Sequence, residues 1–269
     1  MSNLGNYKGF IEDNFRIINK DQVDVPFVLN DIQDQYLLHD ATGRDVILKA
    51  RQQGFSSLIL AVFTADFILK ENSRSVIVAD VDDNAQELLD RVKQYIRSYE
   101  EINSVKVPLK YNSKSELYNE QNGSRYTVGT AKNTEFGRSK TINNLHFSEF
   151  AFYLHPRKML AGAGNAVTEN GRMIIETTAN GFNEFKTFWD ECMIGERPYK
   201  PLFFPASSFY TPEFLQFKQK EQKETFKQEY PETSEEAFLT SGDLFFDAYA
   251  LKYYLDRTML PIKEGLLYV

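Results

Sequence analysis

The chain has 269 residues, of which 42% are hydrophobic and 26% are charged, and its formal net charge is −7. This length and apolar content allow a full hydrophobic core, in one large domain or one domain with appendages. The negative charge excludes a generally basic surface, so any contact with nucleic acid has to be local.

The single cysteine and the apolar stretches exclude further classes. Cys192 alone rules out an intramolecular disulfide and a cysteine-based zinc cluster, and its place beside Trp189 on an apolar helix face indicates a core residue. The longest apolar stretch, residues 58–69, is too short to span a bilayer, and the N-terminal sequence MSNLGNYKGF does not have the layout of a secretion signal. We therefore expect a soluble, cytosolic protein without membrane contact.

The N-terminal segment, residues 1–40, contains the sequence PFVLNDIQDQ, in which Gln33 lies in a short amphipathic helix pattern. A glutamine amide donates and accepts hydrogen bonds at once, which matches the edge of an adenine base. Gln33 is therefore a candidate adenine-binding residue. An exposed helix glutamine is the alternative interpretation.

Residues 46–57, VILKARQQGFSS, predict a strand that runs into a glycine-centred turn and then a helix. Compared with the phosphate-loop pattern G-x-x-x-x-G-K-[ST], residues 49–56 keep Gly54 and Ser56 but have Lys49 at the first glycine and Phe55 at the lysine. Gly54 would let the backbone approach phosphates, the helix N-terminus would hold the anion, and Ser56 could ligate Mg²⁺. An ordinary strand-to-helix turn is the alternative.

The missing lysine leaves the predicted phosphate site one cation short. Losing one charge-assisted hydrogen bond weakens binding by about 1.5–3 kcal/mol, or roughly 10–150-fold. Lys49 and Arg51 lie in the same turn and could replace it, and Arg51 is preferred because a guanidinium can bridge two phosphate oxygens. With Gln52, Gln53 and Ser57, these residues complete the predicted ATP-binding loop.

The middle of the chain alternates strand and helix patterns. A buried strand is predicted at residues 75–80, a long amphipathic helix at 82–99, and a β-rich insertion from residue 105 that turns at Asn122-Gly123 and ends in RYTVGT. Core strands follow at 142–147 and 172–177. The alternation predicts an α/β fold with four or five parallel strands, flanking helices and a β-hairpin insertion.

Residues 125–140 are locally basic in an acidic chain. Arg138 follows Gly137 just before the next strand, so it could extend from a flexible loop to the nucleotide of a neighbouring subunit. A solvated charged loop is the alternative.

The stretch TINNLHFSEF is an apolar strand that ends in an acid, Glu149. A nucleotide hydrolase needs a carboxylate at such a strand end to orient or deprotonate the attacking water, so Glu149 is the candidate catalytic residue. The preceding position often carries an aspartate that holds Mg²⁺ through water, and here it is Ser148, an uncharged and weaker ligand. A strand that happens to end in Ser-Glu is the alternative.

The stretch IIETTANG is a buried strand that ends in small polar residues. Thr177, Thr178 and Asn180 could place hydroxyl and amide groups near a bound γ-phosphate and report its presence. A strand followed by an Asn-Gly turn explains the pattern equally well. Beyond about residue 199 the sequence changes character, with PLFFPASSF followed by a charged, helix-like stretch, and we interpret residues 206–269 as a linker or lid subdomain.

The order of the segments VPFVLNDIQ, KARQQGFSS, INNLHFSEFA, IIETTANG and EYPETSEEAFLTSG resembles the large terminase subunit of tailed bacteriophages, from about residue 15 to 247. The resemblance implies a P-loop ATPase of the ASCE (RecA-like) type that uses ATP and Mg²⁺ to drive double-stranded DNA into a procapsid. Residues 49–57 match the family's variant phosphate loop, with Arg51 at the γ-phosphate and Gln33 at adenine. Glu149 matches the catalytic glutamate and Arg138 the arginine finger inserted in trans.

The same resemblance implies that residues 177–180 couple hydrolysis to movement, while Phe55 and Ser148 depart from the family pattern and leave the strength of Mg²⁺-ATP binding open. The implied division is an N-terminal segment at 1–40, an ATPase core at 41–205 and the linker at 206–269, without the family's nuclease, so no DNA cleavage is expected. The implied partners are viral DNA, the portal protein, the small terminase subunit and copies of the chain in a ring, with a monomer expected in isolation. The implied location is the host cytoplasm and, transiently, the procapsid portal, not the mature virion.

Two other classes remain open at this level. A helicase-like ATPase would share the strand order and the glutamate but should carry strand-tracking motifs in a second domain. A degenerate domain that binds nucleotide weakly and serves assembly is favoured by Phe55 and Ser148.

Overall fold

The computed structural model describes residues 4–136, 141–239, 253, 254 and 257. Its helices are η1 (Leu4–Asn6), α1 (Tyr7–Asn14), α2 (Asp31–Gln35), η2 (Tyr36–Asp40), α3 (Phe55–Leu69), α4 (Asp82–Asn103), η3 (Phe150–Phe152), α5 (Pro156–Gly162), η4 (Gly164–Ala166), α6 (Glu184–Met193), η5 (Ala206–Ser208), α7 (Pro212–Gln222), η6 (Lys223–Thr225), α8 (Phe226–Glu229) and α9 (Ser234–Leu239). Its strands are β1 (Arg16–Ile18), β2 (Asp24–Pro26), β3 (Arg44–Lys49), β4 (Arg74–Ala79), β5 (Leu109–Asn112), β6 (Glu116–Asn119), β7 (Arg125–Thr130), β8 (Ile142–Ser148), β9 (Val167–Thr177) and β10 (Lys200–Phe204). No helix among the described residues is long and apolar enough to cross a membrane.

The main sheet of the described residues has the strand order β10-β3-β9-β8-β4-β7-β6-β5. The strands from β10 to β7 are parallel, and β6 and β5 add an antiparallel edge, which confirms the predicted mainly parallel α/β fold. The prediction of four or five parallel strands was too low, because the parallel run also takes in β7 and β10. Strand β7 pairs with β4 as well as with its hairpin partner β6, and β10 pairs with β3, and neither distant pairing leaves a local sequence signal.

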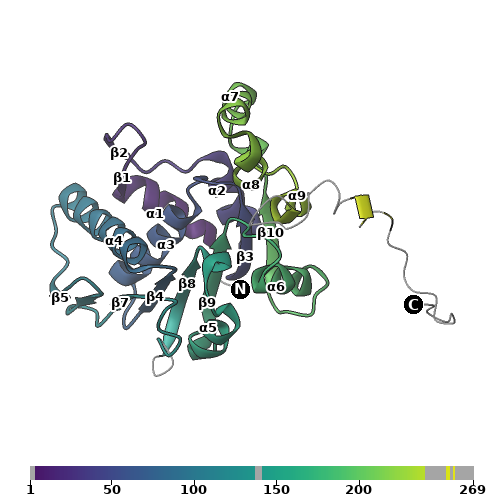
Figure 1. Cartoon of the computed structure of the whole chain (residues 1–269). Coiled ribbons are helices and arrows are strands. Elements are labelled where there is room, and N and C mark those ends of the chain that lie inside the picture. Colours follow the sequence, from purple (N-terminus) through teal and green to yellow (C-terminus); the bar gives the residue numbers. More distant parts are fainter. Residues whose placement is uncertain (1–3, 137–140, 240–252, 255–256, 258–269) are drawn as a thin grey trace.

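Helices cover both faces of the sheet because its central strands are apolar on both sides. Figure 1 shows α1, α3 and α4 on one side and α5 and α6 on the other. On β3, Ile47 packs with the α3 and α4 side, while Val46 and Leu48 pack with the α5 and α6 side. This two-residue alternation decides which strand-end side chains face α3. The prediction that Cys192 and Trp189 are core residues is confirmed, since both are buried on α6.

A buried ion pair fixes α3 against the sheet. Asp66, in the middle of α3, pairs with Arg172 on β9, and Asn144 on β8 hydrogen-bonds to both side chains. Removing one member of a buried pair leaves an uncompensated charge, which costs about 3–5 kcal/mol. The start of α3 is therefore held in a fixed position relative to the ends of β8 and β9.

The segment after β10 packs against the turn that follows β3. Its Tyr210 and Tyr230 form a small cluster with Ala50, and α7, α8 and α9 lie together near β10 (Figure 1). Residues 4–40 contribute Phe15, Phe27 and other side chains to the same core as α3 and α4. The division at residues 40 and 205 stays a prediction.

Candidate functional site

The carboxyl ends of three neighbouring strands meet at one edge of the sheet. Lys49 ends β3, Ser148 ends β8, and Glu176 lies one residue before the end of β9, which runs between them. Glu176 is in register with Ser148 on one side and with Ile47 on the other. Because side chains alternate along a strand, Lys49 shares the face of Ile47, which is the face that α3 covers. In parallel α/β sheets this edge is where ligands bind.

The predicted loop turns into α3 through a left-handed glycine. Gly54 precedes α3 with φ 84°, in the left-handed region, and Phe55 is the first residue of the helix. A Cβ added to Gly54 would lie 2.7 Å from Nε2 of Gln33. Glycine is thus required both by its dihedral angle and by the close approach of α2.

Gln33 uses its amide to hold this turn. Its Nε2 donates to the carbonyl oxygen of Gly54 at 2.7 Å, and its Oε1 accepts from the backbone N–H of Asn30 at 3.0 Å in a capping box at the start of α2. The side chain is buried and does not line the pocket described below. Its predicted contact with adenine stays a prediction.

Phe55, which stands where phosphate loops carry lysine, belongs to the core. Its ring is fully buried, 4.5 Å from the Phe204 ring and 5.7 Å from the Tyr36 ring, measured between centroids. A side chain in this aromatic contact contributes no charge to the site. The aromatic residue at this position therefore stabilises the packing of α3 instead of supplying a cation to the site.

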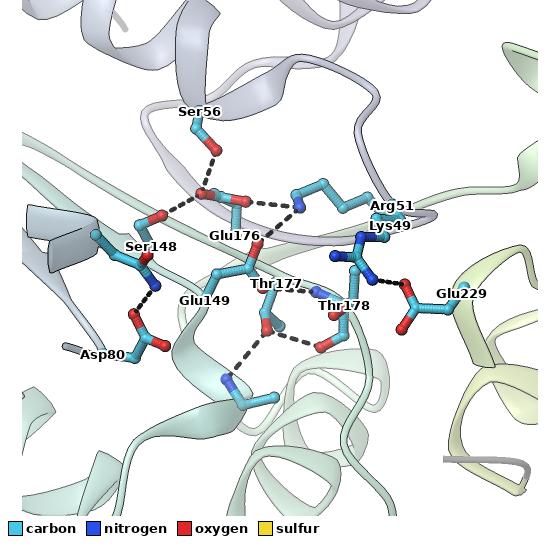
Figure 2. A network of polar contacts seen from close by, with 12 residues as sticks. Lys49, Arg51, Ser56, Asp80, Ser148, Glu149, Glu176, Thr177, Thr178 and Glu229 are labelled. Atoms are coloured by element: carbon cyan, nitrogen blue, oxygen red, sulfur yellow. Dashed lines mark hydrogen bonds and ion pairs between the residues drawn. The ribbon is translucent and has the colours of Figure 1, made fainter. Parts of the chain in front are cut away.

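The two predicted replacement cations point in different directions (Figure 2). Lys49 is nearly buried, and its Nζ lies 3.2 Å from Oε1 of Glu149 and 3.1 Å from Oε2 of Glu176. Arg51 is 56% exposed and pairs with Glu229 on α8 at 3.0 Å. The Lys49 ammonium thus lies between the two carboxylates, whereas Arg51, which also lines the pocket described below, pairs with the C-terminal segment.

The pKa of Lys49 follows from this placement. Burial alone would lower the pKa of the Lys49 ammonium, but the two carboxylates outweigh burial and raise it above its ordinary value. Lys49 is therefore a permanently charged group at the carboxyl edge of the sheet.

Glu149 comes directly after β8 with φ 55° and ψ 46°, a left-handed conformation that costs a non-glycine residue about 1–2 kcal/mol. Such strain persists where the surrounding structure over-determines a residue, and it concentrates at functional sites. Its Oε2 accepts a hydrogen bond from the backbone N–H of Thr178 at 3.4 Å, and its side chain is 32% exposed. Desolvation and the neighbouring Glu176 raise the pKa of Glu149, against the opposing effect of Lys49.

The predicted coupling residues contact the segment that follows Glu149. Thr177 accepts from the backbone N–H of Ala151 at 3.1 Å and donates to the carbonyl oxygen of Thr178 at 2.7 Å. Asn180 donates to the carbonyl oxygen of Ala151 at 3.3 Å. The end of β9 is therefore bonded both to the Glu149 side chain and to the backbone beyond it.

Glu176 is the residue that the sequence analysis missed. Its carboxylate is fully buried, and its Oε1 accepts from the hydroxyls of Ser148 at 2.7 Å and Ser56 at 2.8 Å, with Nε2 of His146 at 3.3 Å (Figure 2). Burial by itself would raise the pKa of Glu176, but Lys49 and His146 bring it below its usual range. An acid inside the apolar run IIETT is the sequence signal that could have identified it.

A pocket of about 480 Å³ opens over this edge. It is lined by Lys49 and residues 51–57 of the loop, by Ser148 and Glu149, by Asp80 directly after β4, and by Arg91 on α4. Arg91 donates to the hydroxyl of Ser57 at 3.2 Å. Arg138, the predicted finger, lies outside the described residues.

No family model matches the chain, and no curated protein matches it. Solved structures do match. The large terminase ATPase domain of Thermus phage P74-26 matches with 16% identity and a TM-score of 0.58 over 75% of this chain and 92% of that chain. The large terminase of bacteriophage HK97 matches with 13% identity and a TM-score of 0.64 over 85% and 54% of the two chains. The large terminase of a thermophilic bacteriophage, in complex with ADP, matches with 12% identity and a TM-score of 0.59 over 76% and 53%.

The chain spans about half the length of the HK97 protein and of the ADP-bound terminase. At these identities the likeness concerns the arrangement of strands and helices. The chain has the RecA-like P-loop fold of the ATPase domain of phage large terminases.

Proposed function

We propose that the chain is the ATPase motor domain of a viral large terminase, which couples ATP hydrolysis to the movement of double-stranded DNA into a procapsid. The observation that carries the proposal is the position of Glu149, held in a left-handed conformation beside Lys49 in the pocket that the loop lines. The fold likeness supports it, since the terminase of the thermophilic bacteriophage has been solved with ADP and also with ATP-γ-S.

In this proposal the loop binds the phosphates of ATP. The backbone around Gly54 and the positive N-terminal end of α3 attract the anion, and Lys49 supplies the charge that Phe55 does not. The γ-phosphate then competes with two carboxylates for the Lys49 ammonium. Binding would therefore loosen the contact between Lys49 and Glu149.

Glu149 would orient the attacking water. A carboxylate released from Lys49 is free to accept a hydrogen bond from water, and its raised pKa makes it a better base than an ordinary glutamate. The N–H of Thr178 donates to the same carboxylate. A shift of Glu149 during turnover would therefore displace the end of β9. We propose this coupling as the route from hydrolysis to movement.

The residues present also suit the magnesium ion that accompanies ATP. Ser56 and Ser148 offer hydroxyl oxygens, the kind of ligand that Mg²⁺ accepts, and both are backed by the Glu176 carboxylate. When bound, the ion would neutralise charge on the β- and γ-phosphates. These two serines are its proposed protein ligands.

The assembled motor would need contributions from other molecules. We propose that copies of the chain form a ring around DNA, that Arg138 of one copy completes the nucleotide site of the next, and that the portal protein and the small terminase subunit bind the ring. The contacts with DNA would be to phosphates and would carry no sequence information. The proposed location is the host cytoplasm and the procapsid portal.

The test of the ATPase proposal uses the 269-residue chain and the variant Glu149→Ala. We expect magnesium-dependent ATP hydrolysis by the unaltered chain, and in Glu149→Ala a loss of turnover with unchanged affinity for a non-hydrolysable ATP analogue. Glu101→Ala, at an exposed position on α4, is the matched control and should keep full activity. Undiminished hydrolysis by Glu149→Ala would refute the active-site assignment.

A second candidate is a weak nucleotide-binding module that serves assembly. The observation that favours it is Phe55, whose side chain is buried in the core and supplies no charge to the site. Calorimetry with an ATP analogue and Mg²⁺ separates the two. Absence of binding at millimolar nucleotide would favour the assembly module.

A further inference from the structure

The strand β9 carries a buried carboxylate next to the serine that replaces the usual aspartate. Glu176 and Ser148 are register partners on adjacent parallel strands. The oxygen Oε1 of Glu176 lies 2.7 Å from the hydroxyl of Ser148 and 2.8 Å from the hydroxyl of Ser56 at the start of α3 (Figure 2). A negative charge therefore lies one strand away from the position where the sequence pattern leads one to expect it.

The direction of these hydrogen bonds matters for metal binding. A serine hydroxyl has one hydrogen and two lone pairs. Ser56 and Ser148 both donate their hydrogens to Glu176, so their lone pairs are directed away from it. Ser56 and Ser148 also line the pocket. A carboxylate behind a ligand fixes the ligand's orientation and increases its affinity for a cation.

The balance of charge around Glu149 and Glu176 also favours a bound cation. Among the described residues, Lys49 is the one lysine or arginine that pairs with either Glu149 or Glu176, so one ammonium faces two carboxylates. Glu176 has no exposed surface, and a buried carboxylate without full compensation is costly. A divalent cation beside Ser56 and Ser148 would supply the missing positive charge.

The described residues contain no cluster of three or more histidine, cysteine, aspartate or glutamate side chains that could hold a metal ion alone. The metal would therefore need the phosphates of the nucleotide as further ligands, as Mg²⁺ commonly does. This separates the site from a free-standing metal centre. It also means that metal binding must be measured together with nucleotide.

We propose that Glu176 is the positioning carboxylate of the magnesium site, which orients Ser56 and Ser148 toward the Mg²⁺ of bound Mg-ATP, so that β9 supplies the charge that β8 does not. The proposal rests on the proposed ATPase function. It assigns to Glu176 a role in metal binding beyond neutralising Lys49. The two roles make different predictions.

The experiment measures the affinity for a non-hydrolysable ATP analogue by calorimetry, once with Mg²⁺ and once with a chelator. The ratio of the two dissociation constants is the magnesium increment. Glu176→Gln keeps the shape of the side chain and removes its charge. We expect it to reduce the increment by about 10–100-fold, while the metal-free affinity changes much less. Glu169→Gln, at an exposed position of the same strand, should keep the full increment.

Three further variants extend the test, and two of them, Ser56→Ala and Ser148→Asp/Glu176→Ser, do not contain Glu176→Gln and keep the test decisive if that variant folds poorly. Ser56→Ala should lose the increment as well, and Glu176→Gln added to it should cause little further loss, because both changes break the same unit. The double variant Ser148→Asp/Glu176→Ser moves the carboxylate back to β8 and should recover most of the increment.

The outcomes distinguish this proposal from the proposed function. If the unaltered chain binds no nucleotide under either condition, the ATPase proposal falls and this inference falls with it. If the chain binds Mg-ATP analogue and Glu176→Gln keeps the increment, or if the effects of Ser56→Ala and Glu176→Gln simply add, the assignment of Glu176 is refuted while the ATPase proposal stands.

Discussion

Replacing Lys49 by methionine tests which cation the loop uses. Methionine keeps much of the length of lysine but carries no charge. In Lys49→Met, Glu149 can turn to water because its side chain is 32% exposed, whereas Glu176 has no exposed surface and keeps an uncompensated charge. Loss of one partner of a buried pair costs about 3–5 kcal/mol. We expect the free energy of unfolding to fall by that amount.

The matched variant is Arg51→Met. Arg51 is 56% exposed and its pair with Glu229 lies at the surface, where such pairs contribute about 0–1 kcal/mol. Its nucleotide affinity should change little, whereas Lys49→Met should lose the equivalent of one charge-assisted hydrogen bond, about 1.5–3 kcal/mol or roughly 10–150-fold. Urea unfolding, followed by the fluorescence of the single tryptophan, Trp189, and calorimetry with an ATP analogue measure the two effects.

A third variant separates charge from packing. In Lys49→Met/Glu176→Gln the buried carboxylate is removed together with its partner, and the glutamine can still accept from Ser56 and Ser148. We expect it to recover at least about 2 kcal/mol of stability relative to Lys49→Met, but no nucleotide affinity. The reasoning is refuted if Arg51→Met loses more nucleotide affinity than Lys49→Met, or if the double variant is no more stable than the single one.

Three other predictions concern the loop, the ring and the core. Gly54→Ala should lose about 1–2 kcal/mol of stability from its left-handed backbone alone, whereas Gly9→Ala in α1, where an added Cβ meets nothing within 4 Å, should gain about 0.5–1 kcal/mol; urea unfolding compares them. Arg138→Ala and Glu149→Ala should each be nearly inactive, since an arginine finger contributes roughly 10³-fold or more. If the finger acts in trans, a mixture of the two variants should regain ATPase activity. A mixture as inactive as its components contradicts the trans assignment. Burial raises the pKa of the Cys192 thiol to about 12, so iodoacetamide should label the native chain at pH 8 far more slowly than the chain in urea, and equal rates measured by mass spectrometry would contradict its burial.

The fold could be predicted from the sequence because its signals are local. Apolar runs and helical periods identify each central element within its own residues, and the helix expected at 82–99 extends to Asn103. The partners of an element are not local. Strand β7 was expected in a hairpin, and it is in one, but its other edge pairs with β4, which lies some 50 residues earlier and gives no signal in β7 itself.

The site could be predicted in part for the same reason. Ser56 and Glu149 were identified because a turn or strand end marks them, and both line the pocket. Arg51 was preferred to Lys49 on the chemistry of the guanidinium alone, because its partner Glu229 lies 178 residues away on α8 and gives no signal in the loop. Glu176 was passed over inside an apolar strand, since the serines that identify it are 28 and 120 residues distant.

Phe55 and Ser148, which stand where a lysine and an aspartate are usual, are connected through the ion pair between Lys49 and Glu176. Position 55 is fully buried between the rings of Tyr36 and Phe204. A lysine there would place an unpaired ammonium in an apolar core, which is energetically costly. In the proposed site, Lys49 supplies the ammonium from the end of β3, and Glu176 supplies the carboxylate from β9, the strand beside it. Each charge makes the burial of the other tolerable. The two charges are therefore coupled, because loss of Lys49 would leave the Glu176 carboxylate, which has no exposed surface, without its ammonium partner.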